Sequence, residues 1–324
     1  MPHSPLVSVI IPIYGVEQYI ERCAISLFEQ SLDNIEFIFV NDCTKDNSIQ
    51  ILKNVIERYP KVKNKTTIIH HKENRGLPQA RRTGLSNAKG EYIAHCDSDD
   101  YIHNNMYSLM YTFAKENDYD LIFCDFNITD NNNCHEKKYF PNAFEDKKQL
   151  YYALFQGGAA HAVWGTLCKK EVYDNGIIFP TANMGEDYVI VTQLTYYAKK
   201  IGYLQNALYY YCQNSNSMMN DTKLNKRIHY AGQLKKNLDT VISFLNQKKI
   251  CSEHITPLKF RHTLQWMFNL RNHKNLCDKN IIYDDINHKI YLNKQISFMD
   301  KIRFFLVSNR LHFLIDWKLK LTKK

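Results

Sequence analysis

The chain has 324 residues, of which 44% are apolar, so it can bury a sizeable core and wholesale disorder is excluded. This length suits one large α/β domain with a smaller helical part, or two modest domains. The net charge is +9, but residues 1–222 hold 21 Lys and Arg against 26 Asp and Glu, whereas residues 223–324 hold 21 against 7. The basic C-terminal part suggests an anionic partner surface, with a solvated basic helical face as the alternative.

The nine cysteines form no CxxC pair, and most lie among apolar or strand-like neighbours. This pattern predicts buried thiols in a reduced, cytosolic chain rather than a disulfide framework or a zinc site. The N-terminal stretch MPHSPLVSVI lacks the basic region and the long apolar run of a signal peptide. Because no run of 18 apolar residues occurs, we expect no membrane span.

Short β-branched runs alternate with amphipathic helical patterns in the first part of the chain. They predict strands at residues 6–12, 35–40, 67–70, 91–96 and 121–126, and helices at 17–30, 46–59, 76–88 and 106–115. This alternation indicates βαβ units, and therefore an α/β fold with a mostly parallel sheet flanked by helices. Residues 127–136 are a polar loop or a hairpin connection, and the chain becomes helical and basic from Asp221 onward.

Acidic residues follow two of the expected strands. Asp42 ends the second strand, and DSDD at residues 97–100 follows the fourth. Because ligands bind at the carboxyl ends of parallel strands, we expect Asp42 and Asp97 to belong to one site. Asp97 and Asp99, two residues apart on a loop, can share Mg²⁺ or Mn²⁺ with ligand phosphates. A cluster of acids at a helix N-terminus would explain the same residues without a metal.

Three stretches carry a family resemblance: IIPIYGVEQYIERCAISLFEQSL, IEFIFVNDCTKDNS and KENRGLPQARRTGLSNAKGEYIAHCDSDDYI. In this order and spacing, they resemble the family 2 glycosyltransferases with the GT-A fold, over roughly residues 6–217. Within this family, the sequence most resembles bacterial transferases that act in capsule, exopolysaccharide or lipopolysaccharide assembly. The resemblance implies a GT-A catalytic domain at residues 1–220, divided at about residue 126 into a nucleotide-sugar-binding half and an acceptor-side half, followed by a basic helical region at 221–324.

The resemblance also implies a donor site and a divalent metal cofactor, Mn²⁺ or Mg²⁺, which neutralises the leaving diphosphate. Asp97 and Asp99 match the metal ligands, and Arg81 could in addition approach a phosphate. The residues that match the donor nucleotide site are Pro12, Tyr14, Glu17, Asp42, Asn74, Gly76, Arg81, Asp97 and Ser98.

On the acceptor side, the resemblance points to MGEDYVI, residues 184–190. Asp187 matches the base that takes the proton of the acceptor hydroxyl in an inverting transfer, and Glu186 would orient the acceptor. The same two acids could simply begin the helix that follows. The acceptor-side segment matches at Trp164, which could equally be a core residue, and at Lys169, and His161 is a further candidate polar contact. The stretch YYYCQNSNSMM, residues 209–219, resembles the segment that closes the family domain, which implies that Tyr211 and Ser217 lie near the diphosphate.

The stretch FMDKIRFFLVSNRLHFLIDWKLK, residues 298–320, has broadly helical apolar spacing with Lys and Arg in between. Such a helix can lie in a membrane interface and meet anionic headgroups, or it can pack on the catalytic domain or another subunit. We therefore expect a cytoplasmic protein that is peripheral on the cytosolic face of the inner membrane. Nucleic-acid binding would fit the charge, but no recognised nucleic-acid-binding module is present.

The expected function is inverting transfer of a sugar from a nucleotide-diphosphate donor, a UDP-sugar, to a glycan or lipid-linked glycan in surface polysaccharide synthesis. A nucleotidyltransferase that makes nucleotide sugars is one alternative, but it usually has a Gly-rich first loop with a basic residue, which IIPIYGVEQY lacks. The other alternative is a non-catalytic relative that only binds nucleotide sugars. This alternative is disfavoured by the joint presence of Asp42, Asp97, Asp99 and Asp187. The sequence leaves the sugar, the acceptor, the linkage and the oligomeric state open.

Overall fold

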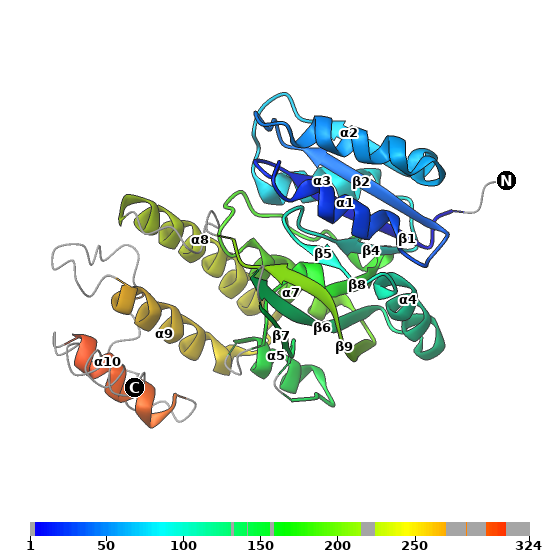
Figure 1. Ribbon diagram of the computed structural model, residues 1–324. Coiled ribbons are helices and arrows are strands. Elements are labelled where there is room, and N and C mark those ends of the chain that lie inside the picture. Colours follow the sequence, from blue (N-terminus) through cyan, green and yellow to red (C-terminus); the bar gives the residue numbers. More distant parts are fainter. Residues whose placement is uncertain are drawn as a thin grey trace.

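The computed structural model describes residues 4–130, 133–140, 142–155, 159–214, 224–269, 283 and 296–308. In this part of the chain, the strands form a sheet in the order β3-β2-β1-β4-β8-β6-β9-β5, with β7 paired to β6. Helices pack against the sheet, and the C-terminal helices lie together to one side of it (Figure 1). The expected α/β architecture with a C-terminal helical region is thus confirmed.

The first half of the sheet is parallel, as expected. Its central strand β1 has every residue buried, which fits a strand covered on both faces. The strands of this half are β1 (Val7–Ile13), β2 (Ile35–Asn41), β3 (Thr66–His70) and β4 (Tyr92–His95). The helices that connect them are α1 (Ile20–Phe28), α2 (Ser48–Arg58) and α3 (Leu77–Asn87), with a 3-10 helix η1 (Pro60–Lys65) after α2.

The second half of the sheet is mixed, so the expectation of a mostly parallel sheet holds only for the first half. Strand β8 lies antiparallel between β4 and β6, while β9 runs parallel to β6 and antiparallel to β5. The pairing of β6 with β7 confirms the hairpin alternative for the polar segment at 127–136. These strands are β5 (Tyr101–Ile102), β6 (Leu121–Asp130), β7 (Asn133–Lys137), β8 (Thr166–Lys169) and β9 (Ile201–Cys212).

Five further helices, counted over the described residues, complete this part of the molecule. Helix α7 begins directly at the acidic pair, after Gly185 with a positive φ of 76°. The helices are α4 (Met106–Asn117), α5 (Lys147–Phe155), η2 (Val163–Gly165), α6 (Lys170–Tyr173) and α7 (Glu186–Tyr197).

Helix α8 (Leu224–Lys248) packs against the part of the molecule that carries the sheet. Its Asn237 side chain donates to the carbonyl oxygens of Ala182 and Met184, both at 2.9 Å. Leu238 and Val241 are buried in the same apolar core as the sheet. The segment that leads into α7 is therefore fixed by α8.

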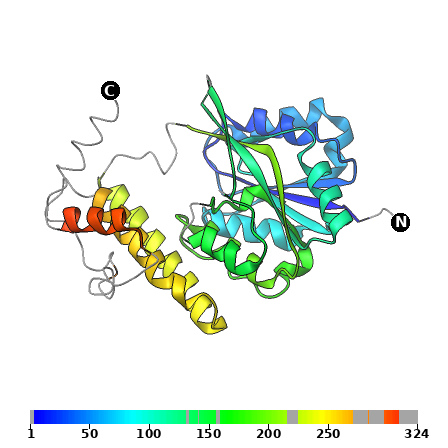
Figure 2. The same cartoon turned by 90° about the horizontal axis from the view of Figure 1, so that it is seen from below.

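The last helices are α9 (Ser252–Asn269) and α10 (Phe298–Ser308), which pack on each other. Figure 2 shows α10 beyond α9, on the side away from the sheet. A small second core joins them, formed by Phe260, Tyr283, Ile296 and Phe304. The helix expected over 298–320 is confirmed as far as Ser308, and residues 309–320 lie outside the described part of the chain. Across the described residues, no helix combines the length and apolarity needed to cross a bilayer.

The cysteines of the described part are free thiols, and most are buried as the sequence predicted. Cys23 in α1 and Cys96 after β4 approach each other to 4.0 Å between their sulfur atoms. Cys277 lies outside the described residues. The buried members of the set are Cys23, Cys96, Cys124, Cys168 and Cys212.

Two glycines in helices give a matched test of the packing. A Cβ on Gly84 of α3 would lie 2.3 Å from Cγ2 of Ile10, whereas a Cβ on Gly232 of α8 would meet nothing within 4 Å. We expect Gly84→Ala to lower the free energy of unfolding by about 1–3 kcal/mol through overpacking. Gly232→Ala should raise it by about 0.5–1 kcal/mol, because alanine favours a helix interior. Urea unfolding of both variants checks this, and equal effects would contradict the close contact of α3 with β1.

Candidate active site

The carboxyl ends of β1, β2 and β4 lie at one edge of the sheet, because these strands are parallel. Pro12 lies at the end of β1, Asp42 directly after β2, and Asp97 two residues after β4. The loops are joined there, since the Ser98 hydroxyl donates to the Pro12 carbonyl at 2.6 Å. The structure thus brings the two predicted acidic positions to the same edge.

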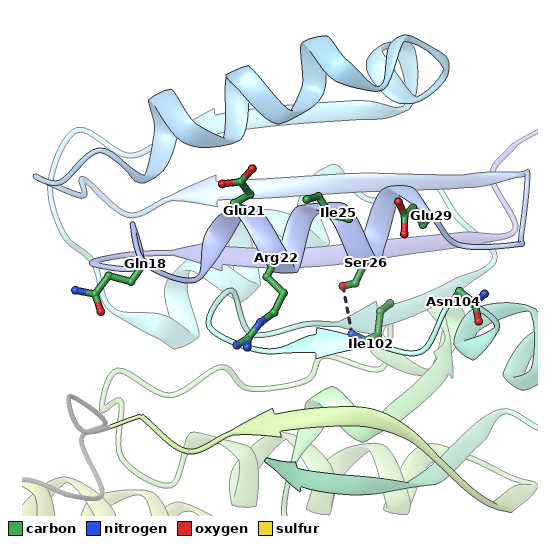
Figure 3. Close-up of a pocket in the computed structure, with 8 residues that line it drawn as sticks. All are labelled: Gln18, Glu21, Arg22, Ile25, Ser26, Glu29, Ile102 and Asn104. Carbon is green, nitrogen blue, oxygen red and sulfur yellow. Dashed lines mark hydrogen bonds between the residues drawn. The ribbon is translucent and has the colours of Figure 1, made fainter. Parts of the chain in front are cut away.

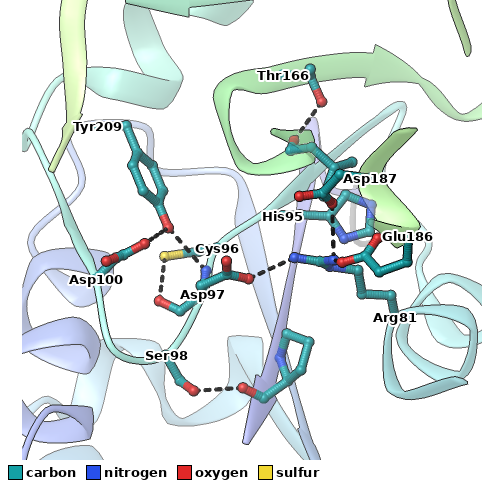
Figure 4. Close-up of polar contacts among 12 residues, drawn as sticks. Arg81, His95, Cys96, Asp97, Ser98, Asp100, Thr166, Glu186, Asp187 and Tyr209 are labelled. Atoms are coloured by element: carbon teal, nitrogen blue, oxygen red, sulfur yellow. Dashed lines mark hydrogen bonds and ion pairs between the residues drawn. The ribbon is translucent and has the colours of Figure 1, made fainter. Parts of the chain in front are cut away.

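Arg81 of α3 is the centre of this edge (Figure 4). Its side chain is fully buried, and Nη2 donates to Oδ1 of Asp97 at 2.7 Å. Nη1 donates to Oδ1 of Asp187 at 3.1 Å and also to the Glu186 carboxylate. Burial lowers the pKa of Arg81, but the charges of Asp97 and Asp187 outweigh it, so that the pKa is raised. The guanidinium therefore stays charged and joins carboxylates from two distant parts of the chain.

This geometry corrects the expectation that Arg81 approaches a donor phosphate. Both terminal nitrogens are occupied by carboxylates, and the side chain is not accessible from solvent. A buried charge without these partners would be strongly unfavourable, so the ion pairs and the position of the side chain depend on each other. Arg81 is a residue that positions Asp97 and Asp187.

The turn at 97–100 separates the roles of its three acids. Asp100 points into the protein, where it accepts hydrogen bonds from the Tyr209 hydroxyl and the Cys212 amide, both at 2.7 Å. The same Tyr209 hydroxyl accepts a bond from the Asp97 amide at 3.1 Å. Burial, followed by the charges of Asp99 and Asp97, raises the pKa of Asp100 well above its ordinary value. Asp100 thus anchors the turn to β9 and leaves the other two acids at the edge.

Asp97 and Asp99 are the two acids that could hold a divalent metal. Asp97 retains 26% exposure of its side chain, and Asp99 is half-buried beside Asn214, which donates to it at 2.8 Å. Burial, and then the charge of Asp97, raises the pKa of Asp99 to about 6. A nearby cation would offset the repulsion that Asp97 contributes to this shift. Among the described residues, no group of three or more His, Cys, Asp and Glu could hold a metal, so ligand oxygens would have to complete the site.

Arg22 is a cation near this turn that the sequence did not indicate. Its Nη2 donates to the Asp99 carbonyl at 3.3 Å and to Sγ of Cys212 at 2.9 Å, and the guanidinium lies 4.7 Å from the Tyr101 ring centroid. Figure 3 shows Arg22 at a pocket on the outer face of α1, which Ile102 and Asn104 also line. Arg22 therefore ties α1 to the acidic turn, while the pocket itself lies outside the carboxylate cluster.

The two acids at the start of α7 differ in exposure. Asp187 keeps 24% exposure of its side chain, whereas Glu186 is 3% exposed and faces Arg81. Burial raises the pKa of Asp187 to about 6, although Arg81 and the Val163 amide act in the opposite direction. A partly exposed carboxylate with this pKa can accept a proton near neutral pH. Glu186, in contrast, is placed to hold Arg81 rather than to meet a second substrate.

Asp42 is buried and shapes the loop before α3. Its Oδ1 accepts from the Arg75 amide at 2.8 Å and contacts Nδ1 of His71 at 2.7 Å, and its Oδ2 accepts from the Gly76 amide at 2.8 Å. A carboxylate offers about four acceptor positions, so the bonds observed here do not use all of them, although only 4% of the Asp42 side chain is exposed. Gly76 has a φ of 86°, and a Cβ there would lie 2.5 Å from Oδ1 of Asn183, which accepts from the Leu77 amide. Glycine is required at this close approach.

The remaining donor-side candidates lie along the same loops. Tyr14 is exposed, at 55%, directly after β1, and Asn74 is exposed in the loop before α3. The Glu17 carboxylate accepts from the Asn47 amide at 3.0 Å, which braces the turn after β1 against the start of α2. Tyr14 and Asn74 are thus available to a ligand, while the observed contact of Glu17 is within the protein.

The acceptor-side candidates do not all reach this edge. The Trp164 ring is buried and stacks on Tyr209 at 4.1 Å between centroids, with Tyr211 at 6.1 Å. It therefore supports the residue that anchors Asp100, as the core alternative allowed. His161 stacks on Tyr188, next to Asp187, at 3.8 Å. Burial lowers the pKa of His161 to about 3, so this ring is neutral. Ser217 lies outside the described residues.

Lys169 lies at the opposite edge of the sheet from the carboxylate cluster. Because β8 is antiparallel to β4, Lys169 pairs with Tyr92 at the start of β4, at the opposite edge from Asp97. Its Nζ donates to Asp118 at 3.0 Å and to Asp120 at 2.9 Å. The acceptor-side role expected of Lys169 is therefore not supported, since its charge is used within the fold.

Arg81 gives the first prediction from this site. We expect Arg81→Met to lower the free energy of unfolding by about 3–5 kcal/mol, because three carboxylates would lose their common cation. Arg82→Met is the control, since Arg82 is the exposed neighbour on the same helix and should change stability by no more than about 0.5 kcal/mol. Urea unfolding measures both, and similar effects of the two substitutions would contradict the central position of Arg81.

Asp99 gives a pH-dependent prediction. Its folded pKa of about 6 lies above the ordinary 3.8, so ionisation of Asp99 destabilises the fold as pH rises through this window. In the presence of a metal chelator, Asp99→Asn should therefore have a higher free energy of unfolding than wild type above pH 6, by about 1–2 kcal/mol. The difference should disappear below about pH 4. Thermal unfolding across this range checks it, with the exposed Asp174→Asn as control. A less stable Asp99→Asn at neutral pH would contradict the raised pKa of Asp99.

The chain is similar in sequence to known glycosyltransferases. A family model described as glycosyl transferase family 2 matches residues 8–169. The chain is 29% identical over 312 residues to the "Uncharacterized glycosyltransferase EpsJ" of Bacillus subtilis, covering 92% of this chain and 85% of that protein. It is 30% identical over 253 residues to the "Minor teichoic acid biosynthesis protein GgaB" of the same species, covering 74% of this chain but only 27% of GgaB.

A solved structure supports the fold. Residues 1–349 of S. aureus TarS, in complex with UDP-GlcNAc, align with a TM-score of 0.58 and 20% identity, and 81% of each chain is covered. At this identity, the likeness shows the fold alone, and it confirms the GT-A type expected from the sequence. Since the family model also matches half of the chain, the protein belongs to glycosyl transferase family 2 and is a glycosyltransferase.

Proposed function

We propose that this glycosyltransferase moves a sugar, with inversion, from a UDP-sugar to a hydroxyl of a glycan or lipid-linked glycan in surface polysaccharide synthesis. One observation carries the proposal. Arg81 holds Asp97, on the donor-side edge, and Asp187, a partly exposed carboxylate, on the same guanidinium. A donor bound at Asp97 and an acceptor at Asp187 would therefore lie next to each other, as a direct transfer requires.

The donor half of the proposal rests on the loops at the carboxyl edge. Tyr14 and Asn74 are exposed there, Asp42 retains acceptor capacity, and Gly76 keeps the loop before α3 close to Asn183. Pro12 and Ser98 fix the two loops against each other. A nucleoside diphosphate is the expected ligand, and UDP is favoured because TarS, which shares the fold, was solved with UDP-GlcNAc.

Asp97 and Asp99 fit a divalent metal, Mn²⁺ or Mg²⁺, because they are two partly exposed carboxylates on one turn, and such hard oxygen donors suit these ions. When bound, such a metal would neutralise charge on the departing diphosphate. Asp100 cannot join the pair, since its carboxylate is used by Tyr209 and Cys212. The Asn214 amide and Arg22 hold Asp99 and its backbone in place.

Asp187 is proposed as the base. Its carboxylate would accept the proton of the acceptor hydroxyl while that oxygen forms a bond to the anomeric carbon of the sugar. The bond from this carbon to the diphosphate breaks at the same time, and the diphosphate leaves with the electron pair. Arg81 and the Val163 amide stabilise the Asp187 carboxylate and fix its direction, and Glu186 supports Arg81.

The acceptor class and the location are supported less directly. GgaB, by its name, acts in teichoic acid biosynthesis, and the chain spans about a quarter of it. This favours a surface polymer as the setting of the reaction. The cytoplasmic location at the inner membrane stays a prediction. Membership of glycosyl transferase family 2 leaves the nucleotidyltransferase alternative without support.

If Asp187 is the base, its substitution should lower the transfer rate without weakening donor binding. Asp187→Asn should reduce the transfer rate by roughly 10²–10⁴-fold, because the amide cannot accept the proton. It should leave the affinity for UDP unchanged. Glu171→Gln, an exposed acid on α6, is the control and should keep full transfer. Transfer at the wild-type rate by Asp187→Asn would contradict the base assignment.

The pH dependence tests the same residue. Because the carboxylate form is the base, the wild-type transfer rate should rise as pH increases through about 6, the pKa of Asp187. The measurement is the transfer rate at saturating donor across this range. A rate that falls with increasing pH there would contradict a carboxylate base.

A further inference from the structure

Helix α10 exposes an unusual amount of apolar surface. Phe298 is 77% exposed and Met299 is 47% exposed, and Phe305 is 48% exposed. The other large apolar side chains that the structure describes as exposed are scattered singly, at Tyr14, Leu109, Tyr152 and Ile178. Single exposed residues are ordinary on protein surfaces, whereas a concentration on one short helix marks an interaction surface.

These residues share one face of the helix. At about 100° per residue, positions 298, 299, 302, 305 and 306 fall within an arc of about 120°. Phe304 lies on the opposite side, where it is buried against Phe260 of α9 at 5.5 Å between ring centroids. The helix is thus fixed by its inner face, and the outer face, formed by Phe298, Met299, Ile302, Phe305 and Leu306, points away from α9.

Two cations border the outer face. Lys301 and Arg303 project about 100° to either side of the centre of the apolar arc. Arg303 forms an ion pair with Asp300 at 2.9 Å, and an exposed pair of this kind is weak enough for another anion to compete with it. Long basic side chains on both borders of an apolar arc are typical of helices that lie in the interface of a membrane.

We propose that the outer face of α10 docks on an anionic lipid surface. Residues 223–324 hold 21 Lys and Arg against 7 Asp and Glu, so the partner that complements this region is negatively charged. A symmetric contact between two copies of the chain would bring two such basic regions together and is disfavoured for this reason. The apolar arc enters the headgroup region, while Lys301 and Arg303 meet the lipid phosphates.

The proposal is independent of the transfer reaction, and its test uses neither donor nor acceptor. The full chain is sedimented with vesicles of phosphatidylcholine alone, or of phosphatidylcholine with about one-third phosphatidylglycerol. We expect binding to the anionic vesicles, weakened by added salt, and little binding to the neutral ones. No binding of the wild-type chain to anionic vesicles would overturn the proposal.

The double variant Phe298→Glu, Met299→Glu tests the face itself. It should reduce binding to anionic vesicles by at least ~10-fold, because two exposed apolar contacts are replaced by charges that the lipid repels. The helix should persist, since acids in the first turn favour it. Leu109→Glu on α4, also an exposed apolar position, is the control and should bind like wild type. Equal binding by the double variant would overturn the assignment to α10.

Light scattering and thermal unfolding distinguish the other possible occupants. If the double variant changed the molecular mass from dimer to monomer, the face would belong to a second copy of the chain. If it lowered the unfolding temperature strongly without affecting vesicle binding, the face would be covered by the chain itself. Either result would overturn the membrane proposal, whereas unchanged mass and unfolding temperature with lost vesicle binding would support it.

Discussion

The buried guanidinium of Arg81 is the constraint on which the site depends. It comes from α3, in the parallel half of the sheet, and it binds Asp97 after β4 together with Glu186 and Asp187 at the start of α7. A charge buried in this way is tolerated only with well-placed partners, so it fixes the relative positions of the two halves. The Asn237 amide on α8 holds the segment before α7, which extends this constraint to the C-terminal helices.

The acids around Arg81 are not equivalent, and their differences follow from their neighbours. Asp100 is taken up by Tyr209 and Cys212, while Asp97 is bound by Arg81 on one side and partly exposed on the other. Asp99 lies close to both of them, and its pKa is raised to about 6. Three carboxylates share the single guanidinium of Arg81, and Asp99 adds a fourth beside Asp97, so the negative charge at the edge exceeds what Arg81 neutralises. This excess is what a site for a cation and an anionic donor requires, because the cation then binds both the protein and the diphosphate.

The sequence predicted the βαβ units well, because β1, β2 and β4 are apolar runs with helices of clear periodicity between them. It also placed Asp42 and Asp97 at one edge, since this follows from the parallel order of the strands. It could not predict the antiparallel insertion of β8, which depends on long-range pairing, and this insertion places Lys169 at the opposite edge from Asp97. The role of Arg81 was missed because burial and ion pairing are tertiary properties. Arg22 lies within the first of the stretches that resemble the family, but the resemblance assigns no role to it or to Tyr209, because their contacts with the acidic turn depend on the tertiary structure.

The most direct test of the account is whether the carboxylate edge binds a nucleoside diphosphate together with a metal. The measurement is thermal unfolding of the wild-type chain with UDP, GDP, CDP or dTDP, each with and without Mn²⁺. We expect that one nucleotide, UDP, stabilises the protein only when Mn²⁺ is present, by about 3 kcal/mol at a hundredfold excess over its Kd. The absence of stabilisation by all four nucleotides under both conditions would contradict the account, because Asp97 and Asp99 would then lack the partner that their charge requires.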